Sequence, residues 1–196
     1  MIDFNNHTEI KVVNPCNRVQ NKSLDSRELL YLCLLIDHYK PVTIMDIGTF
    51  EGNTALNMLA NTHDHAKLWT VDIGDLEPKV AVAGTRYDNK TKQSAVGSQI
   101  KGHPLSSRIS MINIDSMDLD WDELPWFDFI LIDGCHKYEV VKHDTEMALK
   151  HLNLGGVILW HDYGYIPDIT RMIDELTIPV NKIERTRFAF YEGRLE

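Results

Sequence analysis

Cysteine is scarce in this sequence, and long apolar runs are missing. The three cysteines, Cys16, Cys33 and Cys135, lie far apart and include no Cys-x-x-Cys pair, a pattern that indicates reduced thiols. No uncharged apolar stretch approaches the ~20 residues of a membrane-spanning helix. Residues 1–6 (MIDFNN) lack the basic start and apolar run of a secretory signal. We therefore expect a cytoplasmic protein with no membrane partner.

Positive charge is also in short supply. Lysine and arginine number 20 against 29 aspartates and glutamates, which gives a formal net charge of −9 at pH 7. Such an acidic chain lacks the basic surface that binds a phosphate backbone, so we expect no nucleic-acid partner. At 196 residues, of which 43% are hydrophobic, the chain can bury the core of one domain without a metal or a disulfide.

Apolar periodicity divides the chain into a polar arm at residues 1–25 and one domain at residues 26–196. Asp25 with Glu28 resembles a capping box, which favours a helix that begins at Ser26. Farther along, short apolar strands alternate with amphipathic helices, a pattern typical of a mostly parallel α/β sheet covered on both faces. We expect helices at 26–39, 53–61, 137–152 and 167–176, and strands at 42–47, 67–72, 108–114, 127–133, 156–160 and 188–191.

The segment 75–106 interrupts this alternation. It is polar, contains several glycines and is too long for an ordinary connection between a strand and a helix. Two compatible interpretations stay open, namely a helix near 91–100 and a mobile flap over a site.

Polar residues follow each of the first five predicted strands. Ligands of parallel sheets bind beyond the carboxyl ends of the strands. One polar residue at such an end needs no explanation beyond contact with water, but a polar group at all five ends favours a binding site. These residues are Asp46, Asp72, Asp115 with Ser116, Asp133 with His136, and His161 with Asp162.

The turn after the first strand carries two glycines, Gly48 and Gly52. A nicotinamide dinucleotide fingerprint needs three glycines, and a P-loop needs a lysine that is absent here, so the turn matches neither. Its acidic residues, Asp46 and Glu51, disfavour a pyrophosphate and suit a ligand that carries positive charge. Asp72, at the end of the next strand, can accept hydrogen bonds from two ribose hydroxyls.

Four stretches resemble class I S-adenosylmethionine-dependent methyltransferases. DIGTFEGNTAL resembles the first motif of that family, TVDIGD the second, and NIDS the strand end that borders adenine. FDFILIDGCHKYEVVKHDTEMALKHLNLGGVILWHDY resembles the metal-dependent macrocin-type and catechol-type O-methyltransferases. The resemblance covers residues 26–163. It implies a Rossmann-like, doubly wound sheet of about seven strands, mostly parallel, with an antiparallel last strand and helices on both faces.

The resemblance also implies S-adenosylmethionine as the cofactor. The acid and glycines of the first loop would shape the pocket for its methionine end, Asp72 would hold the ribose, and Asp115 would border the adenine. The cofactor-binding residues implied in this way are Asp46, Gly48, Thr49, Gly52, Thr54, Asp72, Asp115, Ser116 and Asp133.

A metal-assisted reaction is implied as well. Asp133 and Asp162 match the metal-binding carboxylates of the family, and His136 matches the macrocin-type general base, so Asp133 and His136 are the expected catalytic residues. His161 is expected either to bind the cation, which would favour Mn²⁺ over Mg²⁺, or to orient Asp162. The catechol-type enzymes have a lysine near the position of His136 and Asp-Asn in place of His161 and Asp162, so the macrocin-type pattern fits this chain better.

Methyl transfer from a sulfonium is an in-line displacement, and a hydroxyl acceptor must lose its proton. A divalent cation and a histidine base both promote that loss. We therefore expect O-methylation of a small molecule or a sugar. The alternatives are a protein that degrades S-adenosylmethionine and a non-catalytic binding module. In the simplest interpretations Asp133 merely caps the helix near Lys137 and His136 is solvated. A homo-oligomer stays open.

Overall fold

The computed structural model describes residues 9–13, 24–74, 76 and 96–193. Three short 3₁₀ helices, η2 (Pro104–Arg108), η3 (Ser116–Asp118) and η4 (Trp121–Glu123), lie between the second and fourth strands. The α-helices are α1 (Ser26–Tyr39), α2 (Asn53–Ala60), α3 (Tyr138–Lys150) and α4 (Pro167–Asp174), and the strands are β1 (Thr43–Ile47), β2 (Lys67–Asp72), β3 (Ile109–Asn113), β4 (Phe127–Ile132), β5 (Leu152–Trp160), β6 (Asn181–Lys182) and β7 (Ala189–Glu192).

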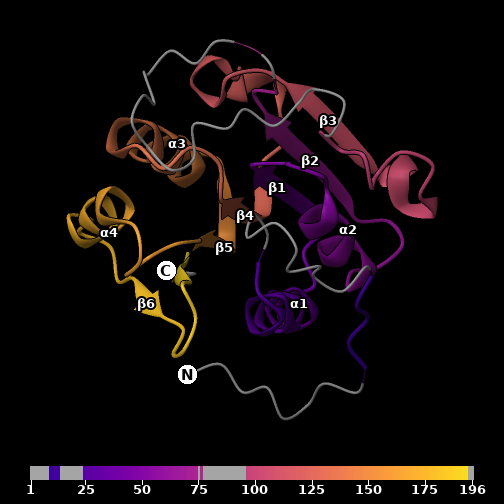
Figure 1. The fold of residues 1–196 in the computed structure, drawn as a ribbon, viewed down its shortest axis with the longest axis horizontal. Helices are drawn as coiled ribbons and strands as arrows, with labels where there is room; N and C mark the ends of the chain where they lie inside the picture. The colour runs from indigo at the N-terminus through magenta and orange to yellow at the C-terminus, as the bar shows by residue number, and fades with distance from the viewer. Residues whose placement is uncertain (1–8, 14–23, 75, 77–95, 194–196) are drawn as a thin grey trace.

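The strands form one sheet in the order β3-β2-β1-β4-β5-β7-β6. β1 to β5 pair in parallel, and β7 runs antiparallel to both β5 and β6. Figure 1 shows α1 and α2 on one face of the sheet and α3 and α4 on the other. The predicted Rossmann-like architecture with an antiparallel last strand is therefore confirmed. β6 escapes prediction because its two exposed residues leave no apolar pattern.

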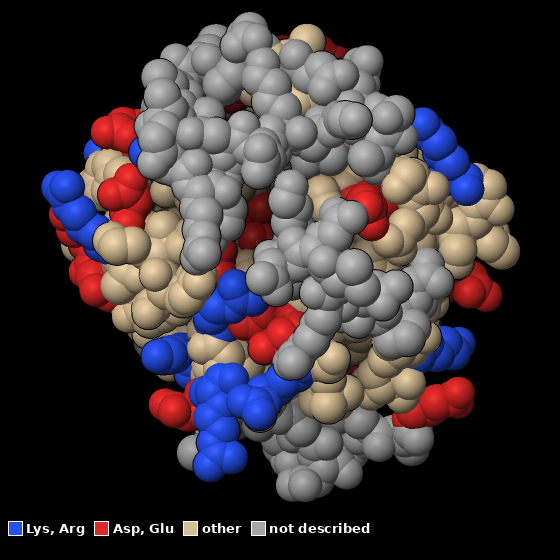
Figure 2. Space-filling model, viewed as in Figure 1, with Lys and Arg blue, Asp and Glu red and all other residues tan. Residues whose placement is uncertain are grey.

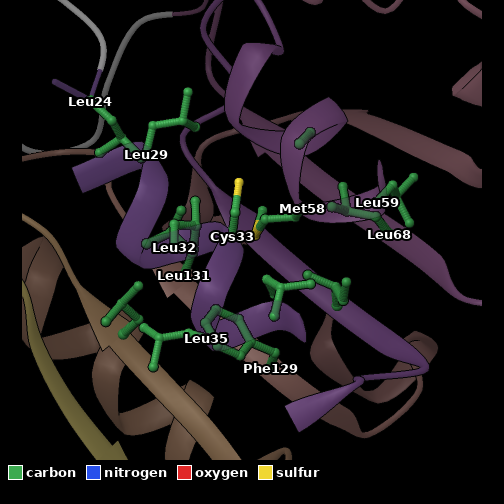
Figure 3. Close-up of a cluster of buried hydrophobic side chains, with 14 of the residues drawn as sticks. Leu24, Leu29, Leu32, Cys33, Leu35, Met58, Leu59, Leu68, Phe129 and Leu131 are labelled. Carbon is green, nitrogen blue, oxygen red and sulfur yellow. The ribbon is translucent and has the colours of Figure 1, made fainter. Parts of the chain in front are cut away.

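The sheet is buried on both faces, as its apolar strands predict. On one side, Leu35 of α1 lies beside Phe129 of β4 (Figure 3). On the other side, Ile130 of β4 belongs to a second apolar cluster, which includes Trp160 and residues of α3 and α4. β4 thus alternates its side chains between two apolar layers, which explains why its sequence, FDFILI, is almost entirely apolar.

α1 begins where the sequence predicts. The Asp25 side chain accepts hydrogen bonds from the backbone N–H groups of Arg27 and Glu28, and the Glu28 side chain accepts from the Asp25 N–H at 3.1 Å. These reciprocal bonds form the predicted capping box and satisfy N–H groups that the helix itself leaves unpaired.

β5 begins earlier than predicted. It starts at Leu152 rather than Gly156, because Leu152 pairs with Phe127 across a register shift in the ladder between β4 and β5. The helix predicted over 137–152 accordingly ends at Lys150. The other predicted helices and strands differ from the observed ones by no more than two residues at either end.

The long segment 75–106 is described only in part. Residues 75 and 77–95, where most of the predicted flap and the first half of the predicted helix would fall, lie outside the described residues. Residues 96–102 form turns rather than a helix. Two of their N–H groups contact the loop after β1, since Gly97 donates to the Phe50 carbonyl at 2.7 Å and Gln99 donates to the Glu51 carbonyl at 3.0 Å.

Of the predicted arm, residues 9–13 and 24–25 are described, and residues 9–13 lie along α2. Basic and acidic side chains are interspersed on the face of the molecule shown in Figure 2. None of the helices in the described ranges combines the length and the apolar composition that crossing a bilayer requires.

Candidate active site

The carboxyl ends of β1, β4 and β5 meet at one edge of the sheet. The Asp133 N–H donates to the Ile47 carbonyl at 2.9 Å, and the His161 N–H donates to the Ile132 carbonyl at 3.2 Å. These backbone hydrogen bonds extend the strand pairing by one residue beyond each strand. They bring predicted site residues from three strands into contact.

Gly48 lets the loop after β1 pass close to β4. Its φ is 115°, and a Cβ at this position would lie 2.3 Å from the Asp133 carbonyl oxygen, so a larger residue does not fit. Farther along the loop, the Phe50 N–H donates to Asp72 Oδ2 at 2.8 Å, and the Gly74 N–H donates to the other Asp72 oxygen at 2.8 Å. Phe50 of this loop and Gly74 after β2 thus hold Asp72, the predicted ribose-binding residue, in one orientation.

Three other predicted cofactor-binding residues in or next to this loop, Gly52, Thr49 and Thr54, have positions explained by the packing and hydrogen bonds of the protein itself. Gly52 caps α2 with a φ of 91°, and a Cβ there would meet the Ile100 side chain at 2.4 Å, so Ile100 occupies the space expected for a ligand. Thr49 Oγ1 is buried 2.7 Å from Thr70 Oγ1. Thr54 lies half-buried in the first turn of α2, at the predicted helix start.

Asp46 is the buried carboxyl group behind the loop. Its Oδ2 accepts from the Thr70 hydroxyl at 3.1 Å, and its Oδ1 has no hydrogen-bond partner within the described part of the chain. Burial raises the pKa of Asp46 well above its usual value, the Thr70 hydrogen bond opposes this, and the charges of Asp133 and Asp72 add to it. An unpaired polar atom at this depth is rare in folded proteins and fits a ligand that supplies the missing partner.

The residues after β3 turn toward α3. Asp115 caps η3 by accepting a backbone N–H at 3.0 Å, and the Ser116 hydroxyl donates to Asp144 Oδ2 at 3.2 Å. Asp144 is 1% exposed. Burial raises its pKa to about 6, although hydrogen bonds from Ser116 and His143 oppose the rise. Ser116, a predicted neighbour of adenine, is therefore bonded to a buried acid.

Asp133, His136 and Asp162 converge beyond the ends of β4 and β5. One ligand-capable atom of each lies within 4.8 Å of the other two, and His136 Nε2 lies 3.1 Å from Asp162 Oδ2. Nitrogen and carboxylate donors at this spacing suit a divalent cation. The interpretation of Asp133 as a helix cap fails, because no side chain caps α3 and Asp133 bonds to His161 instead.

His161 lies directly beside this cluster, with its Nδ1 3.7 Å from Asp162 Oδ1. Its Nδ1 lies 2.9 Å from Asp133 Oδ1, and its Nε2 lies 3.2 Å from Glu28 Oε2. Burial alone would lower the pKa of His161, but Asp133, Glu28 and Asp162 together raise it to about 10. Both ring nitrogens of His161 thus face carboxylates, so the geometry favours a supporting role, exercised on Asp133 and Glu28 rather than on Asp162 as predicted.

Glu28 and Arg187 complete the cluster, and neither is predicted as a site residue. Arg187 donates to both Glu28 oxygens, at 2.8 and 2.6 Å, and to Asp162 Oδ1 at 2.7 Å. Burial alone would raise the pKa of Glu28, but hydrogen bonds from His161 and Arg187 hold it well below its usual value. Asp162, bonded to Arg187, has a φ of 61°, a left-handed conformation that a non-glycine residue adopts mainly when its surroundings impose it.

One sequence signal for Glu28 is its place on the buried face of α1, together with Leu32 and Leu35. A charged residue on the apolar face of a helix is nearly always paired. The capping box already explains why a glutamate stands at position 28, so that motif gives no reason to look for its second role as a partner of Arg187. Arg187 follows no motif, and its contact with Glu28 spans 159 positions.

Comparison with known proteins identifies the protein family to which this chain belongs. A family model described as a methyltransferase domain matches residues 45–163, more than half of the chain. The chain belongs to this methyltransferase family. Among curated proteins, an uncharacterized protein of Acanthamoeba polyphaga mimivirus is 25% identical over 154 residues, which cover 76% of this chain and 65% of that protein. The chain therefore spans slightly less than two-thirds of that relative's length.

Solved methyltransferase structures share the fold. An O-methyltransferase from Bacillus cereus, in complex with S-adenosylhomocysteine, is 17% identical with a TM-score of 0.63, and the match covers 88% of this chain and 82% of that one. An S-adenosylhomocysteine-bound methyltransferase from Podospora anserina is 14% identical with a TM-score of 0.67, covering 90% and 81%. The O-methyltransferase TomG from Streptomyces achromogenes, in complex with S-adenosylmethionine, is 16% identical with a TM-score of 0.58, covering 86% and 79%.

The Asp144→Asn substitution tests whether burial raises the pKa of the Asp144 carboxyl group. The pKa of Asp144 is about 6 in the folded chain against an ordinary 3.8, so the folded state binds more protons between these values and loses stability as the pH rises through them. The difference corresponds to about 3 kcal/mol. In urea unfolding, Asp144→Asn should match the wild type near pH 4 and exceed its stability near pH 7. The exposed Asp64→Asn control should show no such trend, and an equal trend in both variants would contradict the assignment.

The Glu28→Gln substitution tests the ion network. Glu28 is 1% exposed, and its loss leaves two partly or fully buried cations without their shared anion. Breaking a buried ion pair from one side costs about 3–5 kcal/mol. We expect Glu28→Gln to lower the free energy of unfolding by that amount in urea titrations at pH 7. The exposed Glu184→Gln should change it by less than about 0.5 kcal/mol, and similar losses in both variants would show that Glu28 is not a central anion.

Proposed function

We propose that this chain transfers the methyl group of S-adenosylmethionine to a hydroxyl group on a small molecule or a sugar. The observation that carries the proposal is the convergence of Asp133, His136 and Asp162 beside the Gly48 loop, whose Phe50 N–H holds Asp72. Family membership supports the reaction class. The solved structures that hold S-adenosylhomocysteine or S-adenosylmethionine support the choice of cofactor.

The loop after β1 fits this cofactor. Asp72, held by the Phe50 and Gly74 N–H groups, would accept the ribose hydroxyls. The cofactor carries positive charge on its sulfonium and ammonium groups, which suits the acidic surroundings of the loop. The buried Asp46 oxygen without a partner in the described chain fits a ligand or a bound water at the methionine end.

The acceptor hydroxyl would lie beside His136. An imidazole with one nitrogen held by the Asp162 carboxylate is oriented for proton transfer. Asp133 and Asp162, with His136, would hold a divalent cation, which when bound lowers the pKa of a hydroxyl and fixes its position. His136 Nε2 cannot bind the cation and hydrogen-bond Asp162 at the same time. Cation ligand and general base are therefore two alternative roles for His136, which experiment can distinguish.

S-adenosylhomocysteine, the demethylated cofactor, tests the proposal by calorimetry. The full chain should bind it at one site. Asp72→Asn should weaken binding by about tenfold or more, because a charged hydrogen bond contributes about 1.5–3 kcal/mol. The exposed Asp64→Asn control should bind like the wild type. Folded protein that releases no heat would contradict the proposal. S-adenosylmethionine incubated without an acceptor should stay intact by mass spectrometry, and its consumption would favour the degrading alternative.

Mn²⁺ alone tests the cation site through the electron paramagnetic resonance signal of the free ion. We expect one Mn²⁺ per chain, and binding weaker by about tenfold or more in Asp162→Asn. If His136→Ala also loses Mn²⁺, His136 is a ligand, whereas retained binding assigns it to the base role. The exposed His65→Ala is the control. A wild-type chain that binds no Mn²⁺, or an Asp162→Asn variant that binds it normally, would remove the cation from the proposal.

A further inference from the structure

Two asparagines of α2 hold the backbone of residues 9–13. Asn57 Oδ1 accepts from the Val13 N–H at 2.8 Å, and Asn57 Nδ2 donates to the Val13 carbonyl at 2.7 Å. Asn61 repeats this arrangement on Lys11, with both distances at 2.9 Å. Each side-chain amide thus makes the two hydrogen bonds that a residue of a neighbouring β-strand would make.

The spacing of the two asparagines matches that of the segment. Residues four apart on a helix rise about 6 Å along its axis, and residues two apart in an extended chain are separated by about 6.5 Å. Asn57 and Asn61 therefore meet alternate residues and leave Val12 between them with its side chain 47% exposed. Because both contacts are to the backbone, we expect them to tolerate other side chains at position 11.

Burial makes these contacts costly to lose. Asn57 is 0% exposed and Asn61 is 6% exposed. A buried amide group left without a partner destabilises a protein more than the bond itself stabilises it. The side chains of Ile10 and Val13 also pack against the apolar cluster under α1 and α2. Residues 9–13 are therefore bound as an integral part of that face of α2.

Asn57 also contacts the start of α2. Its Nδ2 donates to the Asn53 carbonyl at 2.8 Å and lies 3.2 Å from Asn53 Oδ1. Asn53 directly follows Gly52, the last residue of the loop after β1. One buried side chain thus joins residues 9–13 to the end of that loop, while the turns at 96–102 contact the loop through Phe50 and Glu51.

We propose that the docking of residues 9–13 on α2 and the binding of the adenosyl cofactor stabilise each other, with Asn61 and Asn57 together holding the segment and Asn57 joining it to the start of α2. The inference rests on the proposed function, which assigns the loop before α2 to the cofactor. Asn57 and Asn61 are positioning residues in this scheme. Reciprocity requires that the factor by which the docked segment raises cofactor affinity equals the factor by which the cofactor strengthens docking.

A pair of proline substitutions separates the effect of the Asn61–Lys11 contact from other effects on residues 9–13. Lys11→Pro removes the N–H that Asn61 accepts. Val12→Pro, the matched control, removes an N–H that neither asparagine accepts, and both side chains are exposed. By calorimetry, Lys11→Pro should bind S-adenosylhomocysteine about fivefold more weakly than the wild type, whereas Val12→Pro should bind it normally. Equal affinities in the two variants would overturn the coupling.

Hydrogen exchange followed by mass spectrometry gives the reciprocal measurement. S-adenosylhomocysteine should slow exchange in a peptide that covers residues 9–13 of the wild type by about fivefold, and this protection should shrink in Asn61→Ala. Asn153→Ala is the control, because it removes a side-chain amide bonded to Asp128, away from α2. If the wild type binds the compound but exchange at 9–13 stays unchanged, the coupling is wrong and the proposed function survives. A wild type that does not bind it overturns both.

Discussion

Three carboxylates can share one edge of this sheet because two internal cations lie between them. Arg187 joins Glu28 to Asp162, and His161 joins Glu28 to Asp133. Unpaired charges in such a buried place would be strongly unfavourable, and carboxylates this close repel one another. The two cations offset both effects. The geometry of the candidate site therefore depends on a group of charges that lies largely beneath it.

This arrangement also explains why distant elements contribute to one site. Glu28 comes from the first turn of α1, Asp133 and Asp162 follow β4 and β5, and Arg187 lies just before β7. Each element is anchored in the apolar layers of the sheet, so the charged groups are held by packing as well as by one another. A site supported in this way is held in one arrangement before any ligand binds, and such preorganisation is a major source of rate in enzymes generally.

Much of the fold could be predicted from local patterns. The apolar runs of β1, β4 and β5, the capping box of α1 and the acids at or just beyond the ends of the first five strands are all visible within a few residues of sequence. The start of β5 and the existence of β6 could not be predicted. β5 begins at Leu152 because of its pairing with Phe127, and β6 exists through its pairing with β7. Both depend on partners distant in sequence.

The sequence predicts some members of the candidate site, but neither Glu28 and Arg187 nor the arrangement of the group. The sequence places His136 and His161 after neighbouring strands, yet it does not show which way each imidazole turns. His161 turns toward the α1 face, where its ring lies 5.3 Å from that of Phe188 and between two carboxylates. His136 remains beside Asp162. Arg187, which decides the orientation of Asp162, belongs to no local pattern.

The contact between Glu28 and Arg187 has a consequence for the order of folding. It closes a loop of 159 positions, and contacts between such distant residues form slowly because they require a large loss of chain entropy. Until β7 pairs with β5, Arg187 is not held in position to bond Glu28 and Asp162. Because Glu28 lies in the first helix and Arg187 lies just before the last strand, the charged cluster is complete only when both ends of the domain are folded.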